Sequence, residues 1–97
     1  MTFSELTNQK KPVLVDFYAD WCGPCKMMMP ILDDVKKELG DSVSIIKINV
    51  DKNQNLASTY SVRGVPTLMI FKNGKQLWRQ SGAQSKEQLV SMLKSHM

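Results

Sequence analysis

Two cysteines, Cys22 and Cys25, stand three positions apart and are the only cysteines among the 97 residues. A small domain stapled by disulfides carries four or more cysteines at scattered positions, and two cysteines within one turn cannot join distant segments. The Cys-x-x-Cys spacing does suit both a dithiol and a disulfide without any unfolding. The pair therefore predicts redox chemistry at sulfur rather than a structural cross-link.

A Cys-x-x-Cys pair can also be half of a zinc site, so metal binding is an alternative. Structural zinc needs four ligands, and the only histidine, His96, is next to the last residue. We therefore expect no metal in a single chain. Two copies that share one metal through both motifs stay open as an alternative, which a metal analysis of the purified protein would test.

The cysteines stand where a predicted strand gives way to a predicted helix. Val13–Ala19 is continuous, β-branched and aromatic, which indicates a strand buried on both faces. Cys22–Leu39 carries an apolar stripe at helical spacing, and Gly40 ends it. The free N–H groups and partial positive charge of a helix N-terminus stabilise a thiolate at Cys22. Because a thiol with a pKa of about 8.5 is only about 3% ionised at pH 7, this placement favours Cys22 as a nucleophile.

Asp16 interrupts the apolar strand that precedes the cysteines. An aspartate is rarely buried without a partner, so the position calls for an explanation. One interpretation is a carboxyl group satisfied by the backbone at the end of a strand. The other is a buried proton acceptor, whose pKa is raised because burial disfavours the charged form.

The remaining pattern completes the order α-β-α-β-α-β-β-α. A strand–helix–strand unit predicts parallel pairing with a right-handed crossover, and Asn73-Gly74 predicts a tight hairpin between the last two strands. We expect one domain over residues 1–97, with a mixed sheet covered by helices on both faces. The expected elements are a short helix after Thr2, strands at Val13–Ala19, Val43–Val50, Thr67–Lys72 and Lys75–Ser81, and helices at Cys22–Leu39, Gln54–Tyr60 and from Ser85 onward.

Composition limits the classes of function. Apolar residues make up 42% and charged residues 23%, as in ordinary soluble domains. The net charge of +4 is spread along the chain, so we expect a solvated surface and no nucleic-acid partner. No apolar run reaches the roughly 18 residues of a membrane helix, and Met1–Lys11 does not have the anatomy of a signal peptide. We expect a cytoplasmic monomer.

The hexapeptide Trp21-Cys-Gly-Pro-Cys-Lys26 resembles the signature of the thioredoxin family, and nearly the whole chain from Phe3 onward follows the family's order of motifs. The resemblance implies a thioredoxin-like three-layer α/β/α fold. Its mixed four-stranded sheet would combine a βαβ unit with a C-terminal ββα unit and lack the family's usual first edge strand. The further matching segments are Val15–Ala19, Pro30, Lys47–Asp51, Arg63–Thr67, Phe71–Gly74 and Gly82.

The resemblance also implies roles for the residues around the cysteines. Cys22 would be the exposed attacking thiolate and Cys25 the shielded resolving thiol. Asp16 would assist deprotonation of Cys25, with Lys47 near it. Gly23 and Pro24 lie between the cysteines, and Pro24 is tolerated in the first helical turn, where its missing N–H has no helical partner.

A second set of residues would bind the substrate. The family's proline at the position of Pro66 is cis, which exposes the Val65 backbone for pairing with an extended substrate segment. Trp21 would shield the nucleophile and offer a contact face, and Gly82 would complete this platform.

The implied function is a thiol–disulfide oxidoreductase that acts as a general reductant of protein disulfides. No tightly bound cofactor is implied, because electrons would come from NADPH through a flavoprotein thioredoxin reductase. The expected partners are that reductase and disulfide-containing proteins. An oxidase or isomerase on the same fold, and a binding module without turnover, stay open as alternatives.

Overall fold

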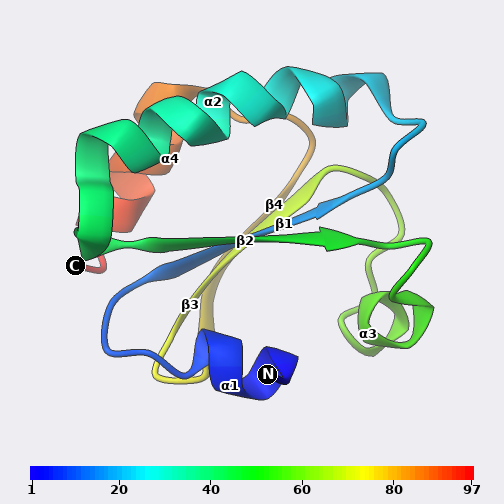
Figure 1. Ribbon diagram of the computed structural model, residues 1–97, viewed down its shortest axis with the longest axis horizontal. Coiled ribbons are helices and arrows are strands. Elements are labelled where there is room, and N and C mark those ends of the chain that lie inside the picture. The colour runs from blue at the N-terminus through cyan, green and yellow to red at the C-terminus, as the bar shows by residue number, and fades with distance from the viewer.

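A mixed four-stranded sheet with strand order β2-β1-β3-β4 forms the middle layer of the protein, whose computed structural model describes all residues from 1 to 97. Figure 1 shows α2 and α4 on one side of this sheet and α1 and α3 on the other. The elements, in chain order, are α1 (Phe3–Thr7), β1 (Val13–Tyr18), α2 (Gly23–Leu39), the 3-10 helix η1 (Gly40–Ser42), β2 (Ser44–Asn49), α3 (Gln54–Thr59), β3 (Thr67–Lys72), β4 (Lys75–Ser81) and α4 (Lys86–Lys94).

The strand pairing confirms the predicted topology. β1 runs parallel to β2 and antiparallel to β3, and β3 pairs with β4 in an antiparallel hairpin. Asn73 and Gly74 both have positive φ at the hairpin turn, as the Asn-Gly pair predicts. In the chain, α2 connects the parallel strands β1 and β2, and the ββα unit follows. Each end of β1 therefore lies beside segments that are distant in the sequence.

Short-range signals set where the helices begin. Thr2 caps α1 through a reciprocal box with Glu5, whose pKa is lowered by hydrogen bonds from the Thr2 backbone and side chain. Ser85 Oγ accepts the N–H of Gln88 at the start of α4. The Gln88 side chain does not return a bond, so only half of the box that the sequence suggests there is formed. No helix is long and apolar enough to span a membrane.

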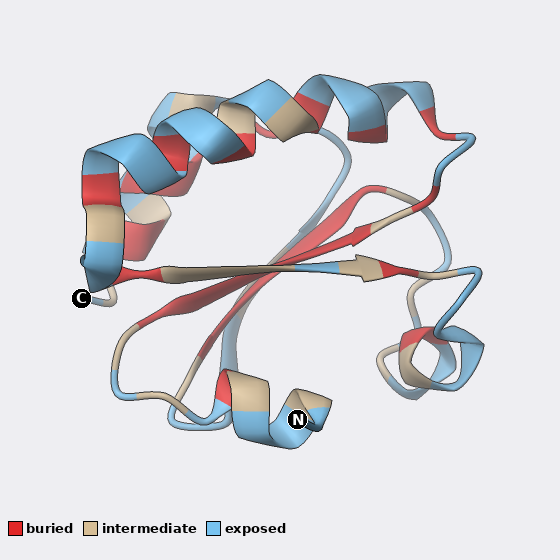
Figure 2. Cartoon of the chain, in the orientation of Figure 1, coloured by how far each residue is buried: buried red, intermediate tan, exposed pale blue.

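Two apolar cores fill the two interfaces between the layers, and the central strands lie between them (Figure 2). The core under α2 and α4 contains Leu14, Met28, Leu32, Leu68 and Leu93. The opposite core contains Val15, Phe17 and Phe71, against which Phe3 and Tyr60 pack in tilted and edge-on contacts. Alternation along β1 thus places Leu14 and Asp16 on the face that α2 covers, and Val15 and Phe17 on the other.

Candidate active site

Cys22 and Cys25 form a disulfide at the N-terminus of α2, so the structure shows the oxidised state of the pair. Their Cα atoms are 5.2 Å apart. Cys22 is the N-cap of the helix in extended backbone conformation, and its Sγ accepts the N–H of Cys25 at 3.2 Å. The cysteine sulfur thus occupies the place that a serine or threonine oxygen takes in most helix caps. This arrangement gives a sulfur anion at Cys22 a charge-assisted hydrogen bond within the first turn.

The two cysteines differ little in exposure, although the resemblance implies an exposed Cys22 and a shielded Cys25. Cys22 is 4% exposed and Cys25 is 1% exposed, so the expectation of an openly exposed Cys22 is wrong. The reason is a long-range contact: Cys22 Sγ lies 3.6 Å from the carbonyl oxygen of Val65, and Tyr18 and Val50 pack against the cysteine pair. In the oxidised state these neighbours cover Cys22 almost completely.

The residues between the cysteines differ in how they contribute. Pro24 is in the first turn of α2, where its missing N–H costs no helical hydrogen bond, as expected. Gly23 is exposed, and a Cβ built on it would meet no atom within 4 Å. Steric crowding inside the protein therefore does not require glycine at position 23.

Asp16 is fully buried beneath α2, and no protein group donates a hydrogen bond to either carboxylate oxygen. This rules out a carboxyl satisfied by the backbone, since the group lies mid-strand in β1 beside Lys47 and Leu68. Burial raises the pKa of Asp16 to about 6, and the nearby Lys47 ammonium opposes that rise. The carboxyl can therefore take up and release a proton near neutral pH, which suits an acid–base role.

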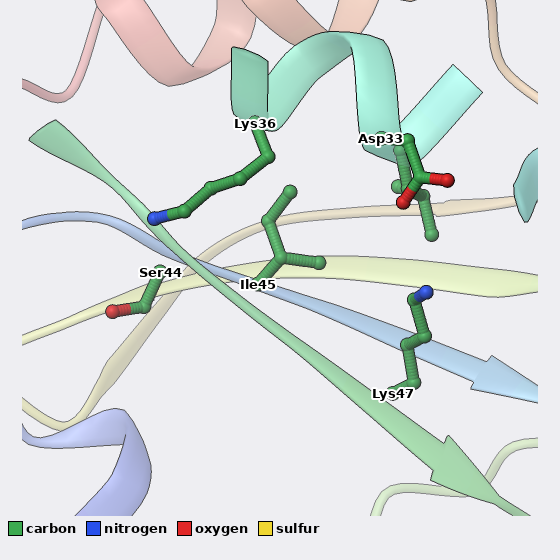
Figure 3. A pocket seen from close by; sticks show the side chains of 6 residues that line it. Asp33, Lys36, Ser44, Ile45 and Lys47 are labelled. Carbon is green, nitrogen blue, oxygen red and sulfur yellow. The ribbon is translucent and has the colours of Figure 1, made fainter. Parts of the chain in front are cut away.

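Lys47 lies opposite Asp16 on the neighbouring strand β2. It is exposed on β2, and its side chain lines a hollow of about 320 Å³ between α2 and β2. In Figure 3 Lys47 and Asp33 face each other at one end of this hollow, and Lys36 lies at the other end. The Lys36 ammonium donates to the carbonyl oxygens of Gly40 and Val43, both at 2.8 Å. Lys47 is thus the lysine of this hollow that is placed to act on Asp16.

The segment before β3 brings its backbone to Cys22. The Val65–Pro66 peptide is cis, as the resemblance implies, and the Val65 carbonyl faces Cys22. Thr67 Oγ1 donates to the Gly64 carbonyl at 2.7 Å, and the Gly82 N–H donates to the Pro66 carbonyl at 2.8 Å. Gly82 has a φ of +88°, a conformation that residues with a side chain rarely adopt. Val65 thus lies next to Cys22, and the Pro66 carbonyl joins this segment to Gly82, although Pro66 itself is buried.

Trp21 flanks the same surface from the other side. The indole is 70% exposed, and its Nε1–H donates to Asp51 Oδ2 at 2.9 Å. Trp21 also borders a shallow hollow of about 100 Å³, which Val65 lines as well. Its other lining residues are Val50, Val62, Arg63, Gly64 and Val65.

Five contributors to this surface were not identified from the sequence: Val50, Asp51, Val62, Arg63 and Gly64, the last two of which begin the matching segment Arg63–Thr67. Asp51 and Val50 end the matching segment Lys47–Asp51, which was a signal that they belong to the site but gave no role. Nothing in the local pattern marks Val62. No group of three or more histidine, cysteine or acidic side chains is arranged to hold a metal ion.

Comparison with known proteins agrees with the geometry. The family model described as Thioredoxin matches residues 1–95. A thioredoxin of Rickettsia typhi is 47% identical over 90 residues, which cover 93% of this chain and 86% of the relative. A thioredoxin of Acidithiobacillus ferridurans is 46% identical over 94 residues, covering 97% and 87%.

A solved structure gives the same result for the fold. A mutant thioredoxin from Halobacterium salinarum NRC-1 superposes with a TM-score of 0.87 at 42% identity, covering 96% of this chain and 80% of that one. Its likeness extends over both the βαβ and the ββα units. With a Cys-x-x-Cys pair at disulfide distance in this setting, the protein is a thiol–disulfide oxidoreductase that reduces protein disulfides, and the chain belongs to the thioredoxin family.

Proposed function

We propose that the protein is a general cytoplasmic reductant of protein disulfides, in which Cys22 attacks and Cys25 resolves. The observation that carries the assignment of roles is the position of Cys22 Sγ at the N-cap of α2, where it accepts the Cys25 N–H. A thiolate is stabilised there by the helix N-terminus, whereas Cys25 is inside the first turn of the helix. The whole chain, residues 1–97, acts as one domain and as a monomer.

The reaction proceeds in two exchanges at sulfur. The Cys22 thiolate attacks one sulfur of the substrate disulfide, the substrate S–S bond breaks, and the departing sulfur leaves as a thiolate. A mixed disulfide now joins Cys22 to the substrate. Asp16 accepts the proton of Cys25, and the Cys25 thiolate attacks Cys22 Sγ. The Cys22–Cys25 disulfide closes, and the second substrate sulfur leaves with the electron pair.

Asp16 and Lys47 manage the proton of the second exchange. With a pKa of about 6, the Asp16 carboxyl is mostly ionised at pH 7 and basic enough to accept a proton. The Lys47 ammonium, on the neighbouring strand, stabilises the ionised form of Asp16 and so sets how readily it takes that proton. Gly23 and Pro24 assist by joining the two cysteines in a short first turn.

Substrate binding uses the surface next to Cys22. An extended substrate segment would pair with the exposed backbone of Val65, between Trp21 on one side and Gly82 on the other. The Val65 carbonyl is 3.6 Å from Cys22 Sγ, so a segment paired there brings its disulfide to the nucleophile. Pro66 supports this platform through its carbonyl, which accepts the Gly82 N–H.

The protein needs two electrons for each turnover. We propose that they come from NADPH through a flavoprotein thioredoxin reductase, which opens the Cys22–Cys25 disulfide. The direct test is NADPH oxidation coupled to reduction of a model protein disulfide such as insulin, with candidate reductases added in turn. Turnover that depends on both cysteines would support the proposal. Absence of turnover with a chemically reduced protein would overturn it.

A further inference from the structure

Asn49, the last residue of β2, joins the two loops on either side of Trp21. The side chain is buried, with only 7% of the residue exposed. Its Oδ1 accepts the N–H groups of Asp51 and Lys52, at 2.9 and 3.2 Å. Its Nδ2 donates to Asp20 Oδ2 at 3.3 Å. One carboxamide therefore holds both the turn after β2 and the loop that leads from β1 to the cysteines.

These two loops meet at the indole of Trp21. Asp20 directly precedes Trp21 in the chain, and Asp51 accepts the Trp21 Nε1–H. The contacts form a closed ring that runs from Asn49 to Asp20, along the chain to Trp21, across to Asp51 and back to Asn49. Cys22 follows Trp21 immediately, so the ring includes the residue just before the proposed nucleophile.

The ring fixes a side chain that packing does not fix. Trp21 is 70% exposed, so few apolar contacts restrain its indole and the bond to Asp51 largely sets its orientation. The geometry of that bond depends on the relative position of the two loops that carry Trp21 and Asp51. A buried carboxamide that bonds to both loops therefore fixes the orientation of the exposed indole between them.

We propose that Asn49 is a positioning residue for substrate recognition: by tying Asp20 to the Asp51 turn, it orients Trp21 against the surface that receives protein disulfides. Asn49 acts through Trp21 and does not touch the reacting sulfurs. The inference rests on the proposed substrate role of Trp21. It predicts that the carboxamide affects the KM for protein disulfides much more than the kcat.

The test is an exchange of the two side chains that share the bond. Asn49→Asp retains the acceptor for the Asp51 and Lys52 N–H groups but sets a carboxylate against Asp20. Asp20→Asn removes the opposing charge. The double variant, Asp20→Asn with Asn49→Asp, restores one donor and one acceptor and the original charge. Asn55→Asp, on the exposed surface of α3, is the control for an added negative charge.

We expect Asn49→Asp to raise the KM for insulin reduction by about two- to tenfold, with little change in kcat. The Trp21 indole N–H resonance should shift, with Trp78 as the internal reference. The double variant should recover both values, and Asn55→Asp should match the wild type. If Asn49→Asp folds poorly, Asp20→Ala removes the acceptor from an exposed position and should raise the KM and shift the Trp21 resonance in the same direction, and an unchanged KM and resonance there would equally overturn the inference.

An unchanged KM and an unchanged Trp21 resonance in Asn49→Asp would overturn the inference. Failure of the folded double variant to recover either value would also overturn it, because the bond to Asp20 would then not be the link. If the wild type reduces no protein disulfide, the proposed function fails, and the Trp21 resonance still decides whether Asn49 orients the indole.

Discussion

The sulfur half and the docking half of the site are held in place by different physical means. The sulfur half consists of Cys22, Cys25 and Asp16, all buried and set within one strand–helix junction. The proposed docking half contains Trp21, Val65, Pro66 and Gly82, which come from three separate loops; one hydrogen bond joins Trp21 to Asp51 and another joins Gly82 to Pro66. Packing and the helix terminus hold the proposed reacting groups, whereas contacts between loops hold the proposed binding surface.

The difference implies that the two halves can be changed separately. Buried groups at a helix start respond to substitution through charge, proton affinity and packing. Exposed loop residues respond through orientation, with small effects on stability. A change in the sulfur half should therefore alter the chemical step, and a change in the docking half should alter the KM.

The largest expected effect is at the cysteines. Cys25→Ser should abolish turnover and accumulate a mixed disulfide at Cys22, because no thiol is left to resolve it. Cys22→Ser should abolish turnover without trapping substrate. Mass spectrometry of each variant after exposure to a protein disulfide measures this directly. Trapping by Cys22→Ser would reverse the assigned roles and place the nucleophile inside the helix.

Asp16→Asn should affect both catalysis and stability, in opposite directions. Loss of the proton acceptor should slow turnover on the order of 10–100-fold at pH 7. The oxidised variant should be more stable than the wild type by about 1–3 kcal/mol at pH 7, because an ionised buried carboxyl without hydrogen bonds is removed. A variant that is less stable and fully active would contradict the assignment of Asp16 to the sulfur half.

The pH dependence of stability gives a separate test of Asp16. The folded protein retains this proton up to about pH 6, whereas the unfolded chain releases it near the ordinary value of 3.8. Between these pH values unfolding releases a proton, so the free energy of unfolding should fall with rising pH, by roughly 3 kcal/mol in all for this group. Urea denaturation from pH 3.5 to pH 7.5 should show that fall in the wild type. Asp16→Asn should lack this component, and identical slopes would exclude the raised pKa.

Trp21→Ala should alter the docking half and leave the sulfur half unchanged. We expect the KM for protein disulfides to rise about three- to tenfold, because a large contact face is lost. The rate at which a small alkylating agent modifies reduced Cys22 measures the sulfur half in the same variant. A rise in KM with retained alkylation supports two separable halves. A comparable loss of alkylation would show that Trp21 also governs the thiolate.

The smallest expected effect is at Arg79, outside both halves. Its guanidinium donates to the carbonyl oxygens of Tyr60 and Ser61, at the end of α3 and just before the segment that leads to Val65. Arg79→Met should lower stability by about 1 kcal/mol and raise the KM by about twofold or less. Thermal denaturation and insulin turnover measure the two values. A KM change as large as that of Trp21→Ala would extend the docking half to β4.

The sulfur half could be predicted from the sequence because its information is local. The Cys-x-x-Cys spacing, the apolar strand before it and the helical stripe after it lie within about one supersecondary unit. Asp16 was identifiable as a charge inside an apolar run, and the structure confirms that its carboxyl is buried. The capping residues Thr2 and Ser85 were equally readable.

The docking half could be predicted only through the resemblance, because its contacts join distant positions. The bond between Trp21 and Asp51 spans 30 positions, and the contact of Cys22 with Val65 spans 43. Neither leaves a periodicity or a spacing that a single sequence reveals. The same contact explains why the exposure of Cys22 was wrongly expected. Asn49 was not identified for the same reason, since nothing in a strand-end asparagine indicates which loops it joins.

The nucleophile also serves as the N-cap of α2, and this double duty couples the redox state to the folding equilibrium. Cys22 Sγ accepts the Cys25 N–H in the disulfide form, and a thiolate in that place is a stronger acceptor. Oxidation, reduction and unfolding form a closed thermodynamic cycle. Any free energy that the cap hydrogen bond gains on reduction must therefore make reduction more favourable in the folded chain than in the unfolded chain, by the same amount. The redox equilibrium and the folding equilibrium therefore both report the strength of this one hydrogen bond.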